Sequence, residues 1–207
     1  FDLFRAAAII GRLGGDEVDP DDLRAIALGH ADAVRAVAGP GAAFEERLDA
    51  LMQVLFVDVG FRGNHKSYHE PGNSYLHRVF QTKRGIPISL ALVTLEVARL
   101  AGLPGYGIAF PGHFLVGFEK DMGDGVPQLV VIDPFHRGRI LGPRDLGGLL
   151  NQLFGGKISL SPQHIAPAAP ADVLVRMLAN LRGIFQRRRD TRMLIRVLNR
   201  LLILRPD

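Results

Sequence analysis

The sequence predicts an α+β fold in which one buried helix packs against a small antiparallel sheet, with a helical N-terminal region and a C-terminal helical hairpin. Three observations lead to this fold class. Residues 87–100 are apolar on almost every side, as in a helix that is surrounded by protein. Helical patterns also occupy the chain before residue 58 and after residue 171. Between them lie three short strand-like stretches separated by turn residues: 106–110, 114–118 and 128–132.

The 207 residues are expected to form four successive parts. The third part is interpreted as a linker because it is rich in proline and alanine. The parts are a helical N-terminal region packed on the core at 1–58, the mixed core at 59–160, the linker at 161–171 and a helix pair at 172–207.

After a first short helix, the N-terminal region is predicted to hold two longer ones. Asp19 is expected to cap the first of these, with Pro20 at its first position, and this helix runs to about Ala38. Glycine and proline at 39–41 interrupt the pattern, and a further helix spans about 44–57. This region carries no polar cluster that suggests chemistry, so its role is packing.

Residues 58–84 form a glycine-punctuated stretch with many polar side chains. We interpret it either as a loop that lines a site or as a simple connector. Asn73 or Ser74 is expected to cap a helix that follows it. That helix buries three apolar residues: Leu76, Val79 and Phe80.

Beyond the strands, a helix is expected at 143–154 and two more at about 172–187 and 190–204. Apolar residues in the last two helices fall near the positions of a 34-residue tetratricopeptide unit. One such unit cannot bury its own faces. We therefore expect these helices to dock on the core, to bind a protein or peptide partner or a second copy of the chain, or to continue into further residues.

Composition excludes several classes of function. The chain has no cysteine, which excludes disulfides, thiolate metal sites and thiol catalysis. No apolar run approaches the roughly 18 residues that span a bilayer, so no membrane partner is expected. No signal peptide is recognised, although residue 1 is Phe, and a cytoplasmic location is the default expectation.

Positive charge is concentrated at the C-terminal end. Residues 171–207 contain nine arginines and three aspartates, a net charge of +6, while the whole chain carries +4. Such a tail could bind nucleic acid or an acidic partner. Phe185 is the only aromatic residue there, which leaves little for base stacking. A solvated helical face is the simpler interpretation, and nucleic acid is disfavoured as a partner.

One pattern of residues could support acyl transfer. That chemistry needs a nucleophile, an imidazole within hydrogen-bond reach, and a group that orients the imidazole. His113 and Asp133 lie at the edges of two successive predicted strands, and pairing of those strands would bring them together. Ser89, near the start of the buried helix, is the only candidate nucleophile in this region.

At these residues the sequence resembles the SirB-type proteins of the transglutaminase-like superfamily. The resemblance covers nearly the whole chain, and its motifs are specific in combination. They are the segments Gly60–Asn64, Asn73–Leu76, Arg84–Ala91, Pro111–Leu115 and Ile132–Phe135.

The resemblance implies a transglutaminase-like core and a triad of cysteine, histidine and aspartate. His113 and Asp133 match the second and third members, whereas the cysteine position corresponds to Pro87. Proline has no nucleophilic side chain, so transglutaminase and thiol-protease activity are not expected. The implied cleft would be lined by the three possible triad residues together with Asn64, Tyr68, Asn73 and Gly112.

Two functional hypotheses follow, and the first leaves the chain without enzymatic activity. In the first, the chain binds a peptide or small ligand and has a regulatory role. In the second, it is a hydrolase or acyltransferase of altered mechanism, with Ser89 or a water molecule acting beside His113 and Asp133. Ser89 lies two residues beyond Pro87, which corresponds to a rotation of about 200° around a regular helix.

No metal or other cofactor is expected. His65 and His69 have the spacing of a helical ligand pair, with Glu70 adjacent. Pro71 and Gly72 argue against a rigid helix there, so we interpret both histidines as exposed loop residues.

Overall fold

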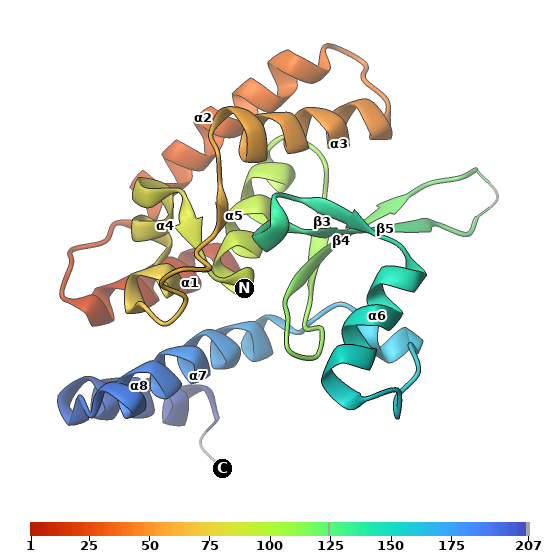
Figure 1. Ribbon diagram of the computed structural model, residues 1–207. Coiled ribbons are helices and arrows are strands. Elements are labelled where there is room, and N and C mark those ends of the chain that lie inside the picture. The colour runs from red at the N-terminus through yellow and green to blue at the C-terminus, as the bar shows by residue number, and fades with distance from the viewer. Residues whose placement is uncertain (124, 206–207) are drawn as a thin grey trace.

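The computed structural model describes residues 1–123 and 125–205. Helix α5 (Pro87–Leu100) lies at the centre and packs against α2 (Pro20–Ala38). In Figure 1, α2 and α3 (Phe44–Met52) lie above α5, and the paired helices α7 (Pro170–Arg188) and α8 (Thr191–Leu204) lie below it. The apolar residues that surround α5 explain why its pattern is hydrophobic on nearly all sides.

The main sheet has four antiparallel strands in the order β3 (Gly105–Ile108), β4 (Leu115–Lys120), β5 (Gln128–Asp133) and β6 (Arg139–Leu141). The first three lie within two residues of the predicted stretches. The fourth was not predicted, because its three residues are too few to show an alternating pattern. Together with the helices, this sheet confirms the α+β class.

Both faces of the sheet are buried. Phe118 of β4 and Ile132 of β5 belong to the larger core around α5. Leu115 and Val131 point to the other face and join a smaller core with Leu150 of α6 (Pro143–Phe154). Alternation of side chains along each strand produces this division, and it fixes the register that positions the ends of β4 and β5.

The N-terminal helices match the prediction except at one end. The side chain of Asp19 accepts a hydrogen bond from the Asp21 amide at 2.9 Å, as expected of a cap. Helix α3 ends at Met52, and a π-helical turn (Gln53–Asp58) replaces the regular helix predicted to residue 57. The Val59 amide donates to the Val54 carbonyl at 2.9 Å, which is the wider spacing of a π turn. Before α2, α1 (Leu3–Ile10) runs into a 3₁₀ turn at Gly11–Gly14.

The predicted cap of α4 (Leu76–Thr82) is wrong. Tyr75 occupies the cap position and makes no side-chain capping bond. Asn73 lies in a preceding 3₁₀ turn (Pro71–Ser74). Its side-chain amide instead donates to the carbonyls of Ser67 at 2.6 Å and Tyr68 at 3.1 Å. These bonds fold the preceding loop back on itself. The three apolar residues expected to be buried by the helix are buried.

A short parallel pair, β1 (Arg62–Gly63) and β2 (Arg84–Gly85), was not predicted. Each strand has only two residues, so neither carries a recognisable pattern. The pair joins the segment after the π turn to the start of α5. It therefore holds two polar loops at the same edge of the core.

The proline-rich stretch before α7 contacts the sheet. It contains a 3₁₀ turn (Pro162–Ile165), and the Ala168 amide donates to the Gly107 carbonyl at 2.8 Å. The two C-terminal helices are present, with α7 beginning two residues earlier than expected. The division into four parts stays a prediction. Among the described residues, no helix combines the length and the apolar character needed to cross a bilayer.

Gly138 provides a test of the packing between the π turn and the residues after β5. It has φ +73°, and a Cβ there would lie 2.5 Å from ring carbons of Phe56. Gly123 also has positive φ, but a Cβ there would meet nothing within 4 Å. Both Gly→Ala changes place alanine at a positive φ, which is unfavourable for a residue with a side chain, whereas only Gly138→Ala overpacks the core. Gly138→Ala should lower the free energy of unfolding by about 1–3 kcal/mol more than Gly123→Ala. Equal losses in chemical denaturation would contradict this packing.

Candidate functional site

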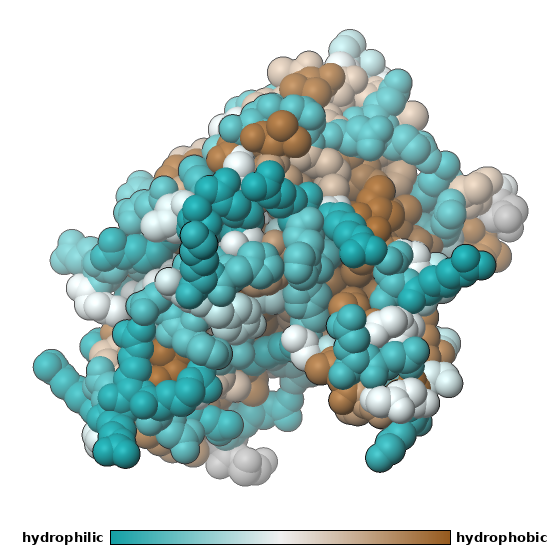
Figure 2. All heavy atoms as spheres, viewed as in Figure 1, coloured by the Kyte–Doolittle hydropathy of each residue, from teal (hydrophilic) through white to brown (hydrophobic). Residues whose placement is uncertain are grey.

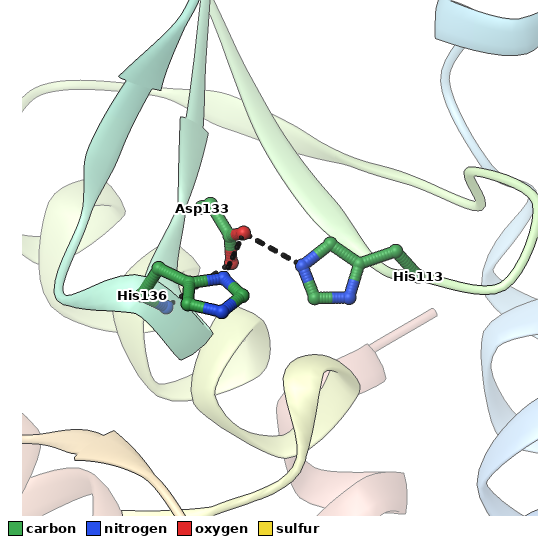
Figure 3. A group of neighbouring side chains, drawn as sticks. All are labelled: His113, Asp133 and His136. Atoms are coloured by element: carbon green, nitrogen blue, oxygen red, sulfur yellow. Dashed lines mark hydrogen bonds and ion pairs between the residues drawn. The ribbon is translucent and has the colours of Figure 1, made fainter. Parts of the chain in front are cut away.

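The structure brings His113 and Asp133 together. His113 lies in the turn before β4, and Asp133 is the last residue of β5, the neighbouring strand. His113 Nε2 lies 2.7 Å from Asp133 Oδ2, as Figure 3 shows. The His113 side chain is 13% exposed and that of Asp133 is 4% exposed, so this contact is largely shielded from water.

A second imidazole, which was not predicted, binds the same carboxylate. His136 Nδ1 lies 2.6 Å from Asp133 Oδ2, and the His136 side chain is half exposed. Asp133 Oδ1 caps the 3₁₀ turn Pro134–His136 by accepting from the amides of Phe135 at 3.0 Å and His136 at 3.3 Å. The spacing of an aspartate followed three residues later by a histidine could have revealed this contact.

The Asp133 carboxylate is held in its ionised form. Burial alone would raise its pKa, but the hydrogen bonds and positive charge of His113 and His136 outweigh burial, so the pKa lies below its ordinary value of 3.8. Each ring that donates to Asp133 keeps its other nitrogen available for a ligand. The two available nitrogens are Nδ1 of His113 and Nε2 of His136.

Phe135 forms the centre of an aromatic cluster at the site. Its ring centroid lies 4.5 Å from that of His65, 5.9 Å from that of Tyr68 and 6.0 Å from that of His113. A Cβ at Gly63 would lie 2.6 Å from the Phe135 ring. Glycine at this position of β1 therefore allows the ring to approach the backbone closely.

Arg176 of α7 supports the turn that carries His113. Its guanidinium donates to the carbonyls of Phe110 at 3.2 Å and His113 at 2.5 Å, and it lies over the Phe114 ring. Burial lowers the Arg176 pKa, and Tyr68 opposes that effect. Within the described chain, Arg176 forms no ion pair with a carboxylate. No sequence pattern indicated this role, because Arg176 is one of nine arginines in the tail.

The residues predicted to bind a ligand mostly build the surrounding loops. The side-chain amide of Asn64 donates to Asn73 Oδ1 at 3.0 Å. The side-chain amide of Asn73 in turn donates to the Tyr68 carbonyl and so holds the loop that contains Tyr68. Gly112, with φ +66°, allows the turn before His113 to pack on Leu153. Of these residues, Tyr68 contacts the aromatic cluster directly.

The structure does not bring Ser89 to His113. Ser89 is fully buried, its hydroxyl donates to the Asn73 carbonyl at 2.6 Å, and it accepts from the Ile86 amide at 3.1 Å. These bonds tie the first turn of α5 to the loop before α4. Pro87 is the first residue of α5.

Three side chains at the site could hold a metal ion. One ligand atom each from His113, Asp133 and His136 lies within 4.8 Å of the others. Ligands about 2.0 Å from a tetrahedral metal lie about 3.3 Å apart, which is longer than the 2.6 Å and 2.7 Å contacts seen here. A bound metal would therefore replace these hydrogen bonds. His65 and His69, the histidines considered from sequence, contact Phe135 and Arg187 respectively.

An open pocket of about 680 Å³ lies beside this cluster. Its lining includes Phe135 and His136 together with Asn64 and His65. The free nitrogen of His136 is thus next to a space of the size that small ligands occupy.

Residues 22–179 match the family model described as the transglutaminase-like superfamily. The chain belongs to this superfamily. The match includes α5, the four-stranded sheet and both His113 and Asp133. No solved structure matches the chain significantly.

Curated relatives carry the name UPF0162 protein. One from Xylella fastidiosa strain 9a5c is 37% identical over 164 residues, covering 78% of this chain and 57% of the relative. One from Vibrio cholerae is 27% identical over 161 residues, covering 78% and 58%. F-box only protein 21 of Mus musculus is 37% identical over 109 residues, covering 51% of this chain and 17% of that protein. The chain thus spans little more than half the length of these bacterial relatives.

The ionised state of Asp133 predicts a pH dependence of stability. Because the folded-state pKa lies below 3.8, the charge contributes stability that is complete above the unfolded pKa and is lost as pH falls through the folded value. The stability difference between the wild type and Asp133→Asn should therefore be larger at about pH 6 than at about pH 3.

Asp49→Asn is the matched control, because Asp49 is exposed. Its difference from wild type at each pH gives the baseline for the loss of one exposed carboxylate. Denaturant titrations at each pH measure both differences. A constant difference for Asp133→Asn would contradict the proposed charge interaction.

Proposed function

We propose that this chain is a non-catalytic transglutaminase-like protein of the SirB-type branch that binds a ligand beside His113 and His136. The observation that carries the proposal is the start of α5. Pro87, which the sequence resemblance aligns with the cysteine of the family, begins the helix, and the nearby Ser89 hydroxyl is buried and bonded to Asn73 and Ile86. The chain contains no thiol that could replace the missing one.

The remaining groups are suited to recognition. The carboxylate of Asp133 orients two imidazoles, each of which keeps one nitrogen available for a ligand. The Phe135 ring adds apolar surface beside His113, and the pocket that Phe135 lines provides space for a small ligand. Binding needs only this preorganised set of donors, acceptors and apolar surface, whereas acyl transfer also needs a nucleophile.

The alternative is hydrolysis by a water molecule next to His113 or by Ser89. The free Nδ1 of His113 favours the water route, because an imidazole oriented by a carboxylate can accept a proton. For Ser89 to react, its hydroxyl would have to leave two buried hydrogen bonds. Loss of such bonds is costly, since it leaves the Ile86 amide without its partner.

We also propose that the C-terminal helices bind a protein or peptide partner, with a second copy of the chain as the alternative. Helix α8 supports this because apolar side chains on its outer side are exposed. Ile195 is 52%, Leu198 38% and Leu202 60% exposed. Their spacing of three and four residues places them on one face, as in a tetratricopeptide-like unit that lacks a neighbour. A cytoplasmic setting is part of this proposal.

Reaction with a fluorophosphonate probe and hydrolysis of p-nitrophenyl acetate test the absence of catalysis. The wild type should show no labelling, and its hydrolysis rate should equal that of His113→Ala, because no activated nucleophile is present. Labelling that disappears in Ser89→Ala, or hydrolysis that depends on His113, would contradict the proposal.

Pro87→Cys provides a positive control. It introduces the sole thiol of the chain at the start of α5, where the helix dipole favours a thiolate. If position 87 corresponds to the nucleophile of the family, the imidazole of His113 also favours the thiolate. Alkylation by iodoacetamide should be faster in Pro87→Cys than in the double variant with His113→Ala. Equal rates would show that position 87 does not correspond to the nucleophile of the family.

A further inference from the structure

The pocket beside His136 is lined by an unusual number of cations. Four positively charged side chains surround it, and two imidazoles lie among them. No carboxylate is among the described residues that line it. The four cations are Arg62, Lys66, Arg84 and Arg137, and the imidazoles belong to His65 and His136. Arg84 belongs to β2, and the two segments that carry the others, 62–67 and 135–137, lie side by side near the centre of Figure 1.

Two of these arginines are forced together by the backbone. Arg62 of β1 is the direct partner of Arg84 in the parallel pair with β2. Neighbouring strands lie about 4.8 Å apart, and like charges on directly paired residues repel one another. The two-residue strands thus place two positive charges next to each other at the edge of the pocket.

The four pocket cations also lack carboxylate partners in the part of the chain that the structure describes, unlike several other cations. Across the described residues, Arg24, Arg78 and Arg99 each form ion pairs with carboxylates. None of the four pocket cations does so. Asp49 lines an adjacent hollow with Arg62 and Arg137, but it forms no ion pair with either. The positive charge around the pocket is therefore uncompensated within the described chain.

Arg137 reaches the pocket from a strained position. Its φ of +56° is left-handed, which is unfavourable by about 1–2 kcal/mol for a residue other than glycine. It follows directly on His136, so the turn that Asp133 caps also delivers a guanidinium to the pocket. The surrounding face is largely hydrophilic, as Figure 2 shows, and its apolar patches lie further away, over α2 and α3 at the top, beside the sheet and around α6.

We propose that this pocket binds a small polyanion, a molecule with two or more phosphate or carboxylate groups, between the Arg62–Arg84 pair and Arg137. Guanidinium groups bind both kinds of anion through paired, charge-assisted hydrogen bonds. A volume of about 680 Å³ suits a small ligand. This inference deepens the binding role proposed above and rests on it, because His136 connects the pocket to Asp133 and His113.

Isothermal titration of the full chain at low salt tests the proposal, with pyrophosphate and citrate as probes. At least one should bind saturably, and the relative affinities distinguish a phosphate from a carboxylate ligand. The double variant Arg62→Gln/Arg84→Gln should weaken binding about tenfold or more. Arg144→Gln, an exposed arginine of α6 outside the pocket, should leave binding unchanged. The single variant Arg84→Gln changes an exposed side chain and provides a second test if the double variant folds poorly.

Three outcomes would overturn the proposal. They are the absence of saturable binding, an equal effect of Arg144→Gln, and binding of a short oligothymidine strand that pyrophosphate does not displace. Absence of binding in a protein that also resists the fluorophosphonate probe would reject the polyanion but leave the non-catalytic role intact. Labelling by the probe together with anion binding would reject the non-catalytic role and keep the pocket.

Discussion

The buried carboxylate of Asp133 is the constraint on which the site depends. One oxygen accepts from His113 and His136, and the other caps the turn that follows β5. A buried, ionised carboxylate is costly unless such partners surround it. The register of β4 and β5 brings His113 to this oxygen, and the two cores on opposite faces of the sheet hold that register in place.

The groups around this carboxylate explain how the transglutaminase-like scaffold keeps the site ordered in a chain without cysteine. Pro87 begins α5, and Ser89 joins that helix to the loop of Asn73. Arg176 reaches from α7 to hold the turn of His113. The site is thus supported by elements that are far apart in the sequence. Support of this kind fixes the imidazoles whether or not they perform chemistry, and it leaves the cationic pocket as the accessible part of the site.

Sequence patterns predicted the parts of the fold that have a clear period or a strong turn signal. The all-round apolar pattern identified α5, and strand order predicted that His113 and Asp133 would meet. Features formed by very short segments were missed, including β6 and the β1–β2 pair. The contact of His136 with Asp133 is local, and their spacing could have indicated it. The contributions of Arg176 and the pocket cations depend on tertiary contacts, which single residues in a sequence do not reveal. The tetratricopeptide-like character of α7 and α8 stays a prediction.

The tautomers of His113 and His136 test the central claim most directly. An ionised Asp133 can only accept hydrogen bonds, so each ring must carry a proton on the nitrogen that faces it. Long-range ¹⁵N–¹H correlation spectra at a pH where both rings are neutral report which nitrogen carries the proton. The account predicts a proton on Nε2 of His113 and on Nδ1 of His136. A neutral His113 protonated on Nδ1, with Nε2 as an acceptor, would contradict it, because Asp133 would then have to donate.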